Sequence, residues 1–237
     1  MVRSLDQALV FLRAACKGGD PPGCAGLGGL LLDGNTEDAY EEARSSLDKA
    51  CTAGDAMGCN NLAGIYEDGL GVPVDGTRAR KLYETACDKG SGMGCSTLAK
   101  ALAEDADEQT RARSAKLFER AKEILQRGCY EGSARACGQV GWFYERGLGT
   151  KLDLPQAVSM YKSGCDGNDG ASCFNLALTR RQASSNDSTI GPLLERACSL
   201  GLAEACTMLK TDPVLERDPA VLHPAAPAPD PPKPAAR

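Results

Sequence analysis

The chain has 237 residues, a formal net charge of −5 and a single histidine, His223, near its C-terminus. The small negative charge and the lack of a basic stripe argue against nucleic acid as a partner, and no apolar run is long enough to span a membrane. One terminal histidine excludes Ser/His/Asp and Cys/His triads and the usual zinc sites, so we expect no catalytic residue of these kinds, no metal and no cofactor.

The twelve cysteines form six pairs, and the two members of every pair lie eight residues apart. Successive first cysteines follow at 35, 36, 42, 36 and 33 residues. Nearly constant spacing of this kind is typical of a repeat protein. The pairs are Cys16 and Cys24, Cys51 and Cys59, Cys87 and Cys95, Cys129 and Cys137, Cys165 and Cys173, and Cys198 and Cys206.

Each pair encloses the signals for a reversal of chain direction. On one continuous helix, residues eight apart are about 12 Å apart along the axis, whereas a disulfide needs Cα atoms within about 7 Å. We therefore predict a helix end, a residue in the left-handed conformation, an N-cap and a new helix, with a disulfide across the corner. The predicted reversal residues are Gly19, Gly54, Gly90, Gly132, Asn168 and Gly201, and the predicted N-caps are Asp20, Asp55, Ser91, Ser133 and Asp169.

The segments on both sides of each corner have helical patterns. Apolar residues recur at spacings of three and four, as in Ala79, Leu82, Tyr83 and Ala86. A small residue precedes every second cysteine, an apolar residue follows it by three positions, and no useful strand-like alternation occurs. The sequence predicts an all-α fold, a right-handed α-solenoid of antiparallel helix pairs over residues 1–210, with about five to six repeats.

The predicted array begins with the second helix of a repeat, which is the helix that precedes a disulfide corner. Residues 1–13 have only a short apolar run, which leads directly into the helix of Cys16 and is no signal peptide. We therefore expect the sequence to be a mature fragment, a trimmed form or one with a mis-assigned start, with a leader upstream.

Two loops between helices are closely similar, and they carry a family resemblance. Tyr66 to Val72 reads YEDGLGV and Tyr144 to Thr150 reads YERGLGT, each followed by an aspartate and an alanine at the same offsets. This pattern resembles the Sel1-like repeat, a relative of the tetratricopeptide repeat, over roughly residues 4–210. A cysteine pair in every repeat resembles the disulfide-rich branch of that family, the Helicobacter cysteine-rich proteins.

Three repeats depart from this pattern. The loop near Asp33 and Gly34 is short, Glu104 to Arg113 is a charged run that we expect to be helical, and only Gln182 to Thr189 separates the helices of the 33-residue unit. These departures affect the regularity of the array and leave the predicted fold unchanged.

Cysteine usage indicates the compartment. Six disulfides that close loops of about nine residues would each contribute about 2.5 kcal/mol by loss of chain entropy, and a reducing cytosol would not maintain them. We expect a periplasmic or secreted protein, with the mitochondrial intermembrane space as the alternative. Twelve free buried cysteines in a cytosolic array would be the opposite interpretation.

The composition changes at Thr211. Eight of the thirteen prolines lie between Pro213 and Pro234, with alanines among them. This composition predicts a disordered, partly extended tail over residues 211–237, which serves as a spacer or carries a docking motif.

Two S-x-x-K matches occur, Ser46 to Lys49 and Ser159 to Lys162. This is the nucleophile motif of serine β-lactamases, and the resembled cysteine-rich proteins are described as penicillin-binding proteins or weak β-lactamases. No S-D-N or K-T-G motif completes such a site, and one S-x-x-K match is expected by chance. A weak β-lactamase or penicillin-binding protein therefore stays as the alternative function.

The position two residues after the second cysteine offers a different candidate site. Its four middle members have side chains that form hydrogen bonds, and amides suit the backbone of an extended peptide because they both donate and accept. We predict a monomeric, non-enzymatic scaffold that binds a protein, an extended peptide or a cell-wall stem peptide on its concave face; a solvated polar face is the simpler explanation. The candidate binding residues are Asn61, Thr97, Gln139 and Asn175.

Overall fold

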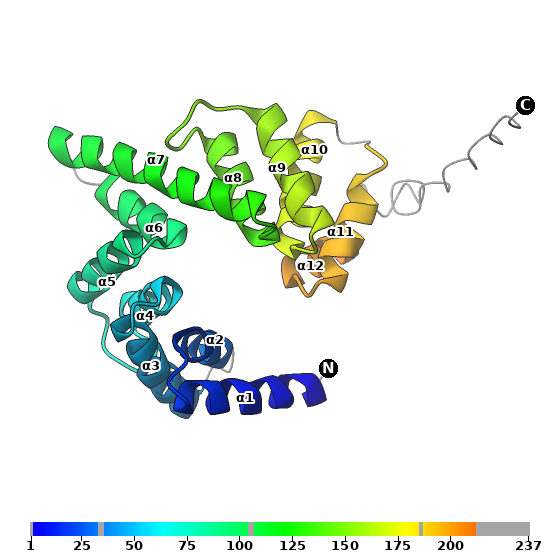
Figure 1. The fold of residues 1–237 in the computed structure, drawn as a ribbon. Helices are drawn as coiled ribbons and strands as arrows, with labels where there is room; N and C mark the ends of the chain where they lie inside the picture. The colour runs from blue at the N-terminus through cyan, green and yellow to red at the C-terminus, as the bar shows by residue number, and fades with distance from the viewer. Residues whose placement is uncertain (1, 33–35, 104–106, 185–186, 212–237) are drawn as a thin grey trace, which may run out of the picture. The chain divides into compact units, whose positions relative to one another are not determined.

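The computed structural model describes residues 2–32, 36–103, 107–184 and 187–211. These residues form twelve α-helices and no strand, which confirms the predicted all-α fold (Figure 1). The predicted loop residues Asp33 and Gly34 lie outside the described residues, as do nearly the whole predicted tail and His223.

The chain divides into two compact units, and the first comprises residues 1–127 and 147–151. Within it α2 packs on α3 and α4 packs on α5, so consecutive helices form antiparallel pairs, and α2 and α4 also contact each other. We call a helix that follows a disulfide corner the first helix of a repeat and the helix that precedes the next corner the second. The helices are α1 (Val2–Lys17), α2 (Pro21–Leu32), α3 (Glu37–Thr52), α4 (Ala56–Asp68), α5 (Gly76–Asp88), α6 (Gly92–Ala103) and α7 (Glu108–Tyr130), whose last three residues belong to the second unit.

The second unit comprises residues 128–146 and 152–237. Here α8 packs on α9, α10 on α11 and α11 on α12, and the first helices α8 and α10 contact each other. Its helices are α8 (Ala134–Arg146), α9 (Leu154–Asp166), α10 (Gly170–Ala183), α11 (Ile190–Ser199) and α12 (Ala203–Thr211).

All six predicted disulfides are confirmed. In each bond the two Cα atoms are 4.3 to 4.7 Å apart, a distance that the chain reaches only because it reverses between the cysteines. The bonds join Cys16 to Cys24, Cys51 to Cys59, Cys87 to Cys95, Cys129 to Cys137, Cys165 to Cys173 and Cys198 to Cys206.

The second cysteine is buried in five of the six bonds. Cys24, Cys59, Cys95, Cys137 and Cys173 are 0 to 5% exposed, whereas Cys206 in α12 is only partly buried. The sequence predicted only that these five cysteines form disulfides. The structure shows that they are also core residues. They hold the helices of a corner together and offer no surface to a ligand.

The backbone of the corners also follows the prediction. Every predicted reversal residue has a positive φ, from 68° at Asn168 to 97° at Gly54 and Gly132. The five predicted N-cap side chains accept a hydrogen bond from the backbone N–H three residues later. The corner is therefore determined locally, by residues that lie within nine positions of one another.

The small residue before each second cysteine allows the two helices of a corner to approach closely. A Cβ atom added at Gly58 would lie 2.5 Å from the Cβ of Ala50, and one added at Gly94 would lie 2.7 Å from the Cβ of Ala86. The apolar residue three positions after the second cysteine is buried in five of the six first helices, at 0 to 3% exposure. Leu209, its equivalent in α12, is only partly buried.

The charged run that we expected to be helical from Glu104 to Arg113 is not helical at Asp107. α6 ends at Ala103, residues 104–106 lie outside the described residues, and α7 starts at Glu108. The Asp107 carboxylate accepts hydrogen bonds from the backbone N–H groups of Gln109 and Thr110. This N-cap sets the start of α7, so the expected helical run is confirmed from Glu108 to Arg113 and wrong at Asp107.

A tyrosine on a second helix donates a hydrogen bond to a glutamate near the end of the preceding first helix in two repeats. The distance is 2.5 Å from Tyr83 to Glu67 and 2.8 Å from Tyr161 to Glu145. Burial first, and then the glutamate, raises the pKa of both phenols above the ordinary value. Both tyrosines are buried.

These raised pKa values predict a loss of stability at alkaline pH. Above about pH 10 tyrosines of the unfolded chain ionise, while Tyr161 stays protonated in the folded chain, so the free energy of unfolding should fall as the pH rises. Denaturant unfolding between pH 8 and pH 11 should show this fall, and it should be smaller in Tyr161→Phe. Tyr130→Phe, at a phenol that is 76% exposed, is the control and should behave like the parent chain. An equal slope in Tyr161→Phe and the parent chain would contradict the prediction.

Candidate functional site

The four predicted binding residues lie on first helices, and all are partly exposed. Asn61 on α4 and Thr97 on α6 belong to the first unit, where these two helices are in contact. Gln139 on α8 and Asn175 on α10 belong to the second unit, where their helices are also in contact. The structure therefore places the candidate residues as one pair on neighbouring helices in each unit.

Asn60 is a polar residue of this region that the sequence pattern did not select. Its side-chain oxygen is buried and has no hydrogen-bond partner, while its amide nitrogen donates to the Asn61 side-chain oxygen at 3.3 Å. A buried acceptor without a partner costs about 1–3 kcal/mol. The only sequence signal is the Asn-Asn pair directly after Cys59. The Asn60 oxygen is covered by the protein, so Asn61, which Asn60 orients, is the amide of this pair that a bound backbone could reach.

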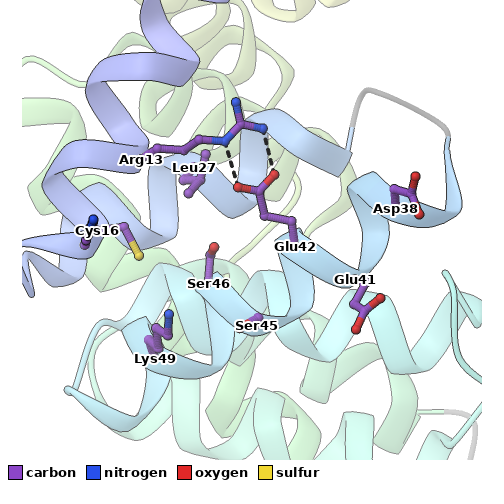
Figure 2. A pocket seen from close by; sticks show the side chains of 10 residues that line it. Arg13, Cys16, Leu27, Asp38, Glu41, Glu42, Ser45, Ser46 and Lys49 are labelled. Atoms are coloured by element: carbon purple, nitrogen blue, oxygen red, sulfur yellow. Dashed lines mark hydrogen bonds and ion pairs between the residues drawn. The ribbon is translucent and has the colours of Figure 1, made fainter.

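A second feature is a hollow of about 560 Å³ between α1, α2 and α3 in the first unit (Figure 2). Leu27 of α2, which is 3% exposed, and the half-cystine Cys16 contribute to its apolar lining. The other lining residues are polar or charged, and they come from α1 and α3: Arg13, Lys17, Asp38, Glu41, Glu42, Ser45, Ser46 and Lys49.

An ion pair crosses this hollow. The Arg13 guanidinium donates two hydrogen bonds of 2.7 Å to the two carboxylate oxygens of Glu42, as Figure 2 shows. These bonds lower the pKa of Glu42 from its ordinary value. The pair is therefore intact at neutral pH and weakens only as the pH falls through that lowered pKa. The pair joins α1 to α3 through a bidentate guanidinium–carboxylate interaction, which only arginine can form.

The two S-x-x-K matches have different surroundings. Ser159 is exposed, and the Lys162 ammonium donates to the Asp166 carboxylate at 2.6 Å, so this match is part of a solvated face. Ser46 is 4% exposed and lines the hollow together with the exposed Lys49.

Among the described residues no group of three or more His, Cys, Asp or Glu side chains is placed to hold a metal ion, and each cysteine is in a disulfide. No helix in the described ranges combines the length and the apolar character that crossing a bilayer requires.

The described helices and corners can be compared with known proteins. The Sel1 repeat family model matches residues 56–91 and 134–169, the two segments that begin at α4 and α8 and contain the paired GLG loops. No curated protein sequence matches the chain significantly.

Solved structures share the fold. A Sel1 repeat protein from Oxalobacter formigenes aligns with a TM-score of 0.52 at 20% identity, covering 85% of this chain and 84% of its own. A putative Sel1 repeat protein from Klebsiella pneumoniae gives 0.52 at 19% identity, covering 84% and 96%. The immunity protein Pa5087 from Pseudomonas aeruginosa gives 0.53 at 15% identity, covering 76% and 69%.

These similarities add no support for the β-lactamase alternative, which rests on the S-x-x-K matches and on the resemblance to the cysteine-rich proteins. The family-model matches, the solved structures and the six disulfide corners agree on one description. The chain is a disulfide-rich protein that carries Sel1 repeats, and its helices adopt the α-solenoid fold of Sel1 repeat proteins.

Proposed function

We propose that this chain is a non-enzymatic scaffold that binds an extended segment of a partner protein, or a peptide, on the exposed faces of its first helices. The observation that carries the proposal is the partly exposed Asn61 amide, whose side-chain oxygen accepts a hydrogen bond from Asn60 and is held in one orientation by it. Each first helix is joined to the preceding second helix by a disulfide, so its side chains are held before a ligand arrives. Preorganisation of this kind lowers the entropy lost on binding.

The ligand and the compartment follow from the same features. A peptide backbone offers N–H and C=O groups in alternation, and amide side chains can satisfy both. A cell-wall stem peptide is one ligand of this kind. Six disulfides suit a periplasmic or secreted protein better than a cytosolic one, although the mitochondrial intermembrane space would also maintain them. We propose that the scaffold acts there as a monomer.

Peptide selection tests the proposal. A display library of random dodecapeptides is selected against the oxidised chain, and the affinity of the best peptide is measured by calorimetry. Asn61→Ala should weaken binding by about fivefold to tenfold if the peptide lies on the first unit, because one hydrogen bond is worth about 1 kcal/mol or slightly more. Asn175→Ala should do the same for a peptide on the second unit.

Thr85→Ala is the matched control, because the Thr85 hydroxyl lies on the second helix α5 and donates only to the Lys81 carbonyl of the same helix. This variant should bind as the parent chain does. The proposal is rejected if no peptide is selected, or if selected peptides bind Asn61→Ala and Asn175→Ala with unchanged affinity.

A further inference from the structure

The hollow between α1, α2 and α3 includes a repeat position at which α3 departs from the pattern of the other second helices. Five residues before the first cysteine, every second helix except α3 has a large apolar residue. Leu82, at this position in α5, packs against the core of the first unit. In α3 the position holds Ser46, so the space that a leucine would fill is open. The six residues are Phe11, Ser46, Leu82, Ile124, Met160 and Leu193.

The Ser46 hydroxyl is poised for a partner from outside the chain. Ser46 is 4% exposed, and among the described residues its side chain makes no hydrogen bond. Figure 2 shows the hydroxyl pointing into the space below the Arg13–Glu42 pair. Among the described residues only the Asn60 side-chain oxygen is sealed from solvent without a partner, so the Ser46 oxygen still faces the solvent in the hollow. A ligand in the hollow would supply the missing bond.

The charged residues of the hollow are ordered along α3. Asp38, Glu41, Ser45 and Lys49 follow one another at helical spacing, so they share one face of the helix. In Figure 2 Asp38 and Glu41 lie on one side of Ser46 along α3, and Lys49 lies on the other side. Lys17, the residue after Cys16, also lines the hollow. One end of the hollow is therefore acidic, and the other end is basic.

The length between the ends limits the ligand. Glu41 and Lys49 are eight residues apart, which corresponds to about 12 Å along a helix axis. An extended peptide advances about 3.4 Å per residue, so three or four residues span this distance. The Arg13–Glu42 pair is satisfied by its own two hydrogen bonds. Within the described residues the charged side chains at the two ends form no ion pair or hydrogen bond.

We propose that this hollow binds a short zwitterionic peptide of about three or four residues. Its ammonium group lies toward Asp38 and Glu41, its carboxylate lies toward Lys17 and Lys49, and its backbone accepts a hydrogen bond from Ser46. Leu27 and the disulfide at Cys16 leave room for small apolar side chains. The site is separate from the surface around Asn61, and it requires both free ends of the peptide.

Titration with trialanine tests the ligand class. Calorimetry with the oxidised full chain should show saturable binding at millimolar concentrations or below. N-acetylated trialanine and trialanine amide should each bind at least about tenfold more weakly, because each lacks one charge-assisted hydrogen bond. Absence of saturable binding, or binding of the two blocked peptides as strong as that of trialanine, overturns the proposal.

Variants locate the site. Ser46→Leu restores the residue type of the other repeats and should abolish binding, while thermal unfolding shows that the fold is kept. Lys49→Gln and Glu41→Gln, at exposed positions, should each weaken trialanine binding about tenfold. Lys81→Gln, at an exposed lysine of α5, and Asn61→Ala should leave it unchanged. If Lys49→Gln and Glu41→Gln bind trialanine like the parent chain, these charges interact only with the helix dipole of α3, and the proposal is wrong.

Discussion

Replacing Cys51 and Cys59 together by alanine should lower the free energy of unfolding of the first unit by about 2.5 kcal/mol. The bond closes a loop of about nine residues, and the unfolded chain gains the corresponding entropy when the bond is removed. Both residues are buried between α3 and α4, so the native helices also lose contacts there. Urea unfolding followed by circular dichroism measures the loss as a lower midpoint.

The corner at Cys198 and Cys206 provides the matched control. The loop has the same length, but only α12, a helix of nine residues, follows this corner in the described part of the chain. Alanine at both positions should release α12 and leave the main transition nearly unchanged, because each repeat is stabilised chiefly by its neighbours. If both double variants unfold at the parent midpoint, the corners do not stabilise the array.

Leu47→Ala should lower the free energy of unfolding of the first unit by about 3 kcal/mol, since a fully buried leucine is replaced and a cavity is left. Leu47 lies four residues before Cys51 on α3 and is 0% exposed. It packs against α2, where a side chain at Gly28 would overlap it. Denaturant unfolding measures this loss. If the slope of the free energy of unfolding against denaturant concentration is the same in the variant and the parent chain, only the stability has changed.

Leu12 occupies the same repeat position on α1 and provides a control with identical chemistry. It is only partly buried, because no first helix precedes α1 in the described residues. Leu12→Ala should therefore cost about 1 kcal/mol, since less apolar surface is lost. Equal losses for the two substitutions would show that the repeat position, and not burial by a neighbouring helix, determines the energy.

The corners could be predicted from the sequence because every determinant is local. The left-handed residue, the N-cap and the two cysteines lie within nine positions, and each acts through backbone geometry that the residue type limits strongly. Asn168 was identified in this way, and it is the one described residue other than glycine with a positive φ. The apolar position three residues after the second cysteine was identified from the same register, and it is buried in five of the six first helices.

The hollow at Ser46 could not be predicted, because it depends on three helices at once. The S-x-x-K match drew attention to Ser46 as a nucleophile, whereas comparison with Leu82 and its equivalents identifies it as a missing apolar side chain. Asn60 was missed for a similar reason, since its burial depends on neighbouring helices. The start of α7 was placed too early because the charge pattern continues through Asp107 without marking the cap. The role of Asn61, Thr97, Gln139 and Asn175 in binding stays a prediction.

The short corners also bear on how the chain acquires its disulfides. With twelve cysteines many pairings are possible, yet the correct partner of each cysteine is also the nearest one in the sequence. The next shortest loop would join Cys173 to Cys198 and contain about 26 residues. Closing a loop of about nine residues has an entropic free-energy cost about 1 kcal/mol lower than closing that loop. Each bond can therefore form as soon as its corner emerges during synthesis or export, without waiting for distant segments. Oxidation from one end of the chain to the other would then need little reshuffling by an isomerase.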